Sequence, residues 1–209
     1  LGIRSDQTSL YSYDLSLFYL NYNNRIGETQ YTDENNRVLR SRGNIGQAVI
    51  QGAETYAEVD LLKLLRPTQK NWSGVFFNNV AFIYSNYTES ELPVTGNSVE
   101  FAPAVNLKNG IRVSYKDLKA SFQYTYLAEQ YTDATNATDG GASAVVGLIP
   151  AYSIMDLSIS YTYKRLKVEG NINNLADKMY FTRRATGYPG PGIIPSDGRS
   201  FYFTIQVAL

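Results

Sequence analysis

Three arginines, Arg183, Arg184 and Arg199, fall within one stretch rich in Gly and Pro near the C-terminal end of the sequence. A guanidinium group pairs with a carboxylate through two parallel hydrogen bonds, and several such groups in one place attract an anionic ligand from solution. The three arginines are therefore candidates for binding an anion. The alternative is that they lie at the rim of the protein and pair with neighbouring acids or with lipid phosphates.

Three further residues could contact the same ligand. Tyr188 lies inside the same stretch and could either touch the ligand or pack to shape the loop. Gln130 and Tyr131 begin an earlier long connection and could face the ligand from there. Two acid-rich stretches, 33–36 and 133–139, offer oxygen atoms, but neither has the spacing of a calcium-binding loop, so we expect polar hairpin tips and no metal.

The sequence contains no histidine and no cysteine among its 209 residues. It therefore lacks a Ser–His catalytic pair, a cysteine nucleophile and the most common zinc ligands. We expect no enzymatic activity and no cofactor. The 19 basic and 19 acidic residues balance, so the charge gives no sign of nucleic-acid binding.

Apolar and polar residues alternate in several segments, which is the pattern of β-strands with one apolar and one polar face. The clearest segment is 155–163, in which Leu157 and Ile159 alternate with Asp156 and Ser158. The polar positions carry charges in segment after segment, and we expect them to line the interior of a barrel: Lys108, Arg112, Asp156, Lys167 and Glu169.

Other segments are less regular. Segments 10–22 and 72–85 do not alternate cleanly, and Leu17–Leu20 is apolar on both faces, so the register of these segments does not follow from the sequence. The stretch Leu61–Leu65 is too short to count as a helix, and no segment offers the ~20 apolar residues of a transmembrane helix.

The connections between these segments alternate in length. Short ones occupy 5–9, 116–118 and 164–166, and long ones occupy 88–100, 133–150 and 182–198. Short turns at one end and long loops at the other are typical of an outer-membrane β-barrel. We count about eight strands and the tail of a ninth at residues 1–4, an all-β fold. A soluble β-sandwich or β-helix is the alternative, but charges at mid-strand argue against it.

The two ends of the chain suggest its place in a larger protein. Residues 201–209 form an alternating strand, which suits the closing strand of such a barrel. Residues Leu1–Asp6 resemble the end of a strand that began earlier. We therefore expect the chain to be the C-terminal part of a longer protein. Residues 1–209 would then lack the signal peptide and the N-terminal domain of that protein.

Four stretches, in this order, resemble the C-terminal barrel of TonB-dependent outer-membrane receptors. They are Asn44–Ala48 with Gly52-Ala-Glu54, Phe101-Ala-Pro103 leading into Leu107, Tyr126–Asp133, and Asn171–Tyr180 with the ending at 201–209. Within that family, Arg183–Arg199 is most similar to receptors of the ferric dicitrate or siderophore type. One departure is Leu209, since these barrels usually end in an aromatic residue.

The resemblance implies that residues 1–209 form about eight to nine strands of a large antiparallel barrel of roughly 22 strands. The barrel would span the outer membrane of a Gram-negative bacterium, in contact with outer-membrane lipid. An N-terminal plug upstream of Leu1 would fill its lumen and connect it to TonB–ExbB–ExbD. The implied function is TonB-dependent uptake of a ferric siderophore or ferric citrate, which are anionic ligands that suit the arginines.

Two other functions remain open on the sequence alone. A passive porin would share the alternation but would have no plug, and a surface adhesin would use the long loops to bind a macromolecule. The four resembling stretches favour the transporter over both. The identity of the ligand does not follow from the fold.

Overall fold

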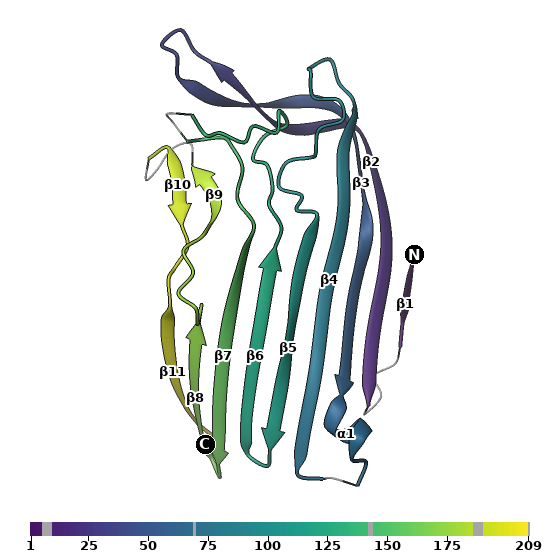
Figure 1. The fold of residues 1–209 in the computed structure, drawn as a ribbon, viewed down its shortest axis with the longest axis vertical. Helices are drawn as coiled ribbons and strands as arrows, with labels where there is room; N and C mark the ends of the chain where they lie inside the picture. Colours follow the sequence, from purple (N-terminus) through teal and green to yellow (C-terminus); the bar gives the residue numbers. More distant parts are fainter. Residues whose placement is uncertain (6–9, 69, 142–143, 186–189, 209) are drawn as a thin grey trace.

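In the part of the chain that the structure describes, nine antiparallel strands form one continuous sheet, and a two-stranded hairpin lies beside it (Figure 1). The computed structural model describes residues 1–5, 10–68, 70–141, 144–185 and 190–208. The strands of the large sheet, in spatial order, are β1 (Gly2–Arg4), β2 (Tyr11–Thr32), β3 (Val38–Asp60), β4 (Trp72–Glu89), β5 (Val105–Tyr115), β6 (Leu118–Leu127), β7 (Tyr152–Tyr163), β8 (Leu166–Asn173) and β11 (Ser200–Val207).

The sequence-based expectation of eight strands and the tail of a ninth is confirmed, with β1 as that tail. The described residues form one large sheet rather than the two facing sheets of a sandwich. Two local expectations were wrong. The connection 182–198, expected to be a loop, contains the hairpin strands β9 (Phe181–Ala185) and β10 (Gly192–Pro195). Leu61–Leu65, expected to be too short for a helix, forms the helix α1.

The cap of α1 explains why so short a helix forms. Asp60 ends β3, and its Oδ1 accepts a hydrogen bond from the backbone N–H of Lys63 at 2.9 Å. A side-chain oxygen in this position satisfies one of the free N–H groups at a helix start. The other oxygen of Asp60 accepts a hydrogen bond from Ser73 Oγ at 2.8 Å, which ties the helix to β4. No helix of the described residues is long and apolar enough to cross a membrane.

The register of the sheet sorts its side chains onto two faces. One row across the sheet is apolar and runs from β4 to β11 through Phe76, Ile111, Phe122, Leu157, Ile172 and Phe201. The next row is mostly polar and runs through Val75, Arg112, Ser121, Ser158, Asn171 and Tyr202. We call these the apolar face and the polar face. Side chains on the apolar face are well exposed, up to 70% for Phe201 and Phe203.

The charges expected in the interior of a barrel all lie on the polar face, where several are paired. Arg112 forms a salt bridge with Glu58, and its guanidinium group lies 5.1 Å from the centre of the Phe77 ring. Lys167 forms a salt bridge with Glu169 at 2.7 Å. The polar face therefore holds three of these five charges in ion pairs within the wall of the sheet.

Two phenylalanines on the polar face account for part of the irregular pattern in segments 10–22 and 72–85. Phe18 lies opposite Gly52, and Phe77 lies opposite Gly110. Each ring covers its glycine so closely that an added Cβ would lie 2.8 Å from Phe18 and 2.7 Å from Phe77. The ring thus fills the space that a side chain would take, so these strands carry apolar residues on both faces.

The two ends of the sheet differ. The turn end comprises the connections 5–10, 61–71, 116–117 and 164–165, and the loop end comprises residues 25–45, 90–104, 128–151 and 174–199. At the loop end the β2–β3 hairpin bends across the neighbouring strands (Figure 1). Irregular pairing around Arg25, with Gly46 at a φ of 134°, marks the bend.

Candidate ligand-binding site at the loop end

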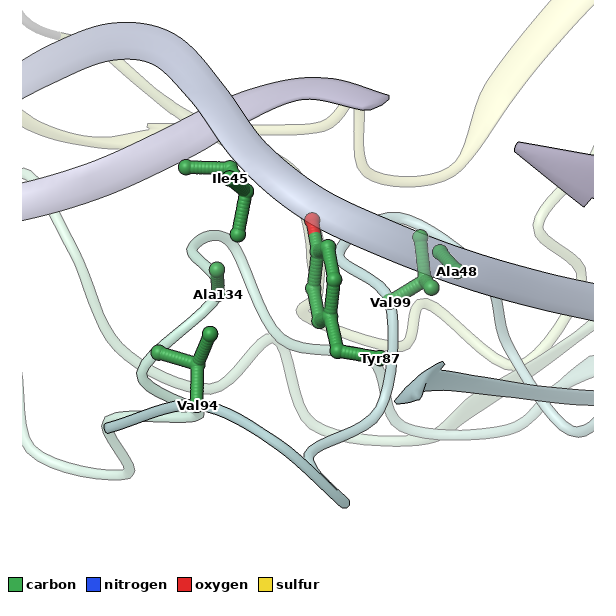
Figure 2. Close-up of a cluster of buried hydrophobic side chains, with 6 residues drawn as sticks. All are labelled: Ile45, Ala48, Tyr87, Val94, Val99 and Ala134. Atoms are coloured by element: carbon green, nitrogen blue, oxygen red, sulfur yellow. The ribbon is translucent and has the colours of Figure 1, made fainter. Parts of the chain in front are cut away.

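The connections at the loop end pack around a small hydrophobic core of their own. It contains Ile45, Ala48, Tyr87, Val94, Val99 and Ala134, each at most 3% exposed (Figure 2). These residues come from β3, β4 and two separate long connections. Burial of their side chains holds those connections together, so the loop end is a structured cap rather than a set of independent loops.

A buried carboxylate links three elements of this cap. Glu100, whose side chain is 4% exposed, accepts a hydrogen bond from the Tyr87 hydroxyl at 2.6 Å. Arg25 on β2 lies 3.6 Å from the other carboxylate oxygen, and the backbone N–H of Glu28 donates to the same oxygen at 3.4 Å. The Tyr87 hydroxyl thus donates to a carboxylate that is shielded from solvent. This network fixes the base of the β2–β3 hairpin against β4.

Two arginines hold the connection 128–151 through its backbone. Arg184 on β9 donates to the carbonyl oxygens of Ala144 and Leu148 at 3.0 and 2.8 Å. Arg40 on β3 donates to the carbonyl oxygen of Val145 at 2.8 Å and forms a salt bridge with Glu28 at 2.8 Å. Burial and the nearby positive charge of Arg40 lower the pKa of Arg184, while a nearby acid opposes this shift. We call Arg40 and Arg184 the arginine clamp.

Arg183, the neighbour of Arg184 on β9, is placed differently. It is exposed and lines a polar groove of about 640 Å³. The groove lies between the β9–β10 hairpin and the polar face of β7, β8 and β11, and its other polar lining residues include Asp156, Asn173, Asp197 and Tyr202. Arg183 is the one arginine among its lining residues in the described part of the chain. The groove thus combines one cation with carboxylate, amide and phenol groups.

Arg199 lies apart from the clamp. It is exposed just before β11, and its backbone N–H donates to Asp177 Oδ1 at 2.8 Å. The structure therefore brings Arg184 together with Arg40 rather than with Arg199. Tyr188 lies outside the described residues.

The residues at the start of the connection 128–151 are mostly buried. Gln130 is 9% exposed, and its backbone forms a bridge with Ile149. Tyr131 is half-buried, and its carbonyl oxygen accepts a hydrogen bond from Phe101 N–H at 2.9 Å. Asp133 is fully buried, and its Oδ2 accepts from the N–H of Thr135. These contacts shape the connection from within.

Sequence reasoning missed Arg25, Arg40 and Glu100. Each of these residues pairs with a group distant in the sequence, such as the 105 positions between Arg40 and Val145. The sequence gives no sign of which partner a charged residue meets at such a separation. Within the described residues, no group of three or more His, Cys, Asp and Glu side chains is placed to hold a metal ion.

Comparison with known proteins gives the context for this arrangement. Residues 1–175 match the family described as TonB dependent receptor-like, beta-barrel. The structure is similar to the ferric citrate transporter FecA in its unliganded form, at 22% identity and a TM-score of 0.77, over 99% of this chain and 30% of that one.

Two further solved structures show the same fold. The copper transporter OprC is 15% identical with a TM-score of 0.72, over 99% of this chain and 30% of that one. The ferric yersiniabactin uptake receptor FyuA from Yersinia pestis is 19% identical with a TM-score of 0.72, over 99% of this chain and 28% of that one. No curated protein sequence matches. The chain spans about 30% of the length of the structures it resembles.

Proposed function

The chain belongs to the TonB-dependent receptor-like β-barrel family, and from that premise we propose that its protein imports a ferric chelate across the outer membrane of a Gram-negative bacterium. The family match over residues 1–175 is the observation that carries the proposal. In this function the protein is a transporter rather than an enzyme, and the energy for uptake comes from TonB with ExbB and ExbD.

The two faces of the sheet support a membrane-spanning role. The apolar face exposes rows of Ile, Phe, Leu and Tyr side chains, which suit contact with outer-membrane lipid. The polar face carries charges, several of them in ion pairs, which suit a hydrated lumen. We further propose that residues 1–209 are the C-terminal portion of a barrel of roughly 22 strands, since the solved relatives are about three times longer. The remaining strands would pair with β1 and β11, and a plug domain would fill the lumen.

The polar groove is the part of the cap best suited to meet an anionic chelate. Arg183 is exposed there, so its guanidinium group can pair with a carboxylate or other oxygen anion of the ligand. Arg184 is already engaged by two carbonyl oxygens, so in this proposal it positions the neighbouring connection. Gln130 and Tyr131 act in the same indirect way.

The solved relatives suggest which ligands to test first. They include a ferric citrate transporter, a ferric yersiniabactin uptake receptor and a receptor from Pseudomonas aeruginosa in complex with enterobactin. We propose a ferric siderophore or ferric citrate for this protein, with ferric citrate as the first ligand to test because Arg183 suits its carboxylates.

The experiment is a binding measurement on the complete receptor in detergent with ferric citrate, iron-free citrate and two ferric siderophores. We expect one ferric chelate to bind with a Kd in the micromolar range or below, and iron-free citrate to bind far more weakly. Arg183→Gln should weaken binding by about tenfold or more, as expected for loss of a charge-assisted hydrogen bond. The matched control, Lys178→Gln, removes an exposed cation from the same end and should bind normally. Absence of binding for every ferric chelate would contradict the proposal.

A further inference from the structure

The turn end of the sheet carries a belt of aromatic side chains on its apolar face. One row across the sheet pairs Trp72 with Tyr115, Tyr115 with Leu118, and Leu118 with Tyr161. Tyr163 lies one step closer to the turn. All of these side chains are between 36% and 57% exposed, and the rings of Trp72 and Tyr115 lie 4.4 Å apart. Such rings favour the boundary between hydrocarbon and water.

The connections beyond this belt are strongly basic. Three of them, 61–71, 116–117 and 164–165, carry Lys63, Arg66, Lys70, Lys116, Lys164 and Arg165 against one acid, Asp117. The fourth connection contains the acid Asp6, which lies outside the described residues. At the loop end, acids outnumber basic residues, although the whole chain is neutral. Positive charge is thus concentrated next to the aromatic belt.

Two lysines are held directly over rings of the belt. Lys116 Nζ lies 5.4 Å from the centre of the Tyr115 ring, and Lys164 Nζ lies 5.3 Å from the centre of the Tyr163 ring. Because both rings belong to the apolar face, both ammonium groups lie on that side of the wall rather than on the polar side. Each lysine is exposed and can therefore reach a ligand outside the sheet.

The backbone at these two lysines is unfavourable for lysine. Each is the first of two turn residues in a tight hairpin, with a φ of 51° at Lys116 and 53° at Lys164. Two-residue hairpins with positive φ favour Gly or Asn. The hairpins would therefore form at least as well with Asn at either position. Turn geometry does not account for lysine there, whereas a role for its charge does.

We propose that the turn end binds the headgroups of anionic phospholipids, with Lys116 and Lys164 as the central contacts. The aromatic belt places these ammonium groups at the depth of the lipid phosphates, and a negative headgroup complements the positive connections. This inference rests on the proposed function, because the turn end faces a lipid leaflet only if the sheet spans a membrane. The proposed lipid-binding site lies at the opposite end of the sheet from the polar groove.

The test uses the complete receptor in detergent, with phosphatidylglycerol or phosphatidylcholine added and bound lipid counted by native mass spectrometry. We expect the wild-type receptor to bind phosphatidylglycerol more tightly than phosphatidylcholine. Lys116→Asn together with Lys164→Asn should weaken that binding roughly thirty-fold, since each lysine near an anionic lipid surface contributes about fivefold in affinity. Asn suits the positive φ, so the heat stability of this variant should equal or exceed that of wild type.

The control variant is Arg42→Gln together with Lys178→Gln, which removes two exposed cations from the loop end. It should bind phosphatidylglycerol as wild type does. An equal loss in both variants, no preference for phosphatidylglycerol, or displacement of the lipid by excess inorganic phosphate would each overturn the proposal. Binding of a ferric chelate, measured on the same samples, should be unchanged in the Asn variant. Loss of the lipid preference alone would leave the transport function standing.

Discussion

Replacing Ile159 with Arg tests the assignment of the two faces most sharply. Ile159 lies on the apolar face of β7, opposite Gly170 on β8, and is 47% exposed. It is four residues from Tyr163 in the aromatic belt, which corresponds to about 13 Å along the strand. A strand tilt of about 40° reduces this to about 10 Å along the membrane normal. The lipid-facing band of such a barrel is about 25 Å tall, so Ile159 lies close to the bilayer midplane.

Arginine at that depth should destabilise the barrel by about 2–4 kcal/mol. Ser158→Arg should cost less than about 1 kcal/mol, because Ser158 lies on the polar face between Ser121 and Asn171, where a charge meets water. Tyr163→Arg is a depth control, since an arginine near the membrane interface costs only about 0–1 kcal/mol.

The assay is reversible unfolding of the complete receptor from phospholipid vesicles in guanidinium chloride. The free energy of unfolding is compared for the three variants and wild type. Equal losses at Ile159 and Ser158 would refute the assignment of faces. A loss at Tyr163 as large as that at Ile159 would refute the depth.

The remaining stability predictions concern glycines, the buried network and the arginine clamp. Gly110→Ala should lower the free energy of unfolding by about 1–3 kcal/mol, because an added Cβ would lie 2.1 Å from a backbone oxygen. Gly170→Ala is the control: the space around Gly170 is open, so the same unfolding assay should show almost no loss. Tyr87→Phe removes a hydrogen bond to a buried carboxylate and should cost roughly 1.5–3 kcal/mol; an unchanged free energy of unfolding would refute the role of that network. Arg184→Ala should make the connection 128–151 sensitive to limited proteolysis, while Arg183→Ala should leave it resistant; equal sensitivity would contradict the clamp.

The sequence predicts the strands because alternation is a local property. Segment 155–163 shows this most clearly, since Leu157 and Ile159 fall on the apolar face while Asp156 and Ser158 fall on the polar face, as expected. The side-chain period of two is set by backbone geometry, so the face of each residue follows without knowledge of its neighbours. The same argument places Lys108 and Glu169 on the polar face.

Pairing across strands is not a local property, and the sequence does not predict the features that depend on it. The large ring of Phe18 is accommodated on the polar face because Gly52 lies opposite, and that partner is known only from the register. The structured cap at the loop end could not be predicted for the same reason, because Tyr87 and Ala134 share one core despite their distance in the chain. Hence the sequence predicts a cluster of binding residues around Arg183 and Arg184, while the structure gives these neighbours different environments.

Uptake of a radiolabelled ferric chelate by whole cells tests the central claim most directly. The complete receptor is produced in a strain that lacks other ferric-chelate receptors, with and without TonB. We predict iron uptake from ferric citrate or a ferric siderophore that is lost when TonB is absent. Uptake that persists without TonB would indicate a passive porin, and no uptake of any ferric chelate would contradict the account.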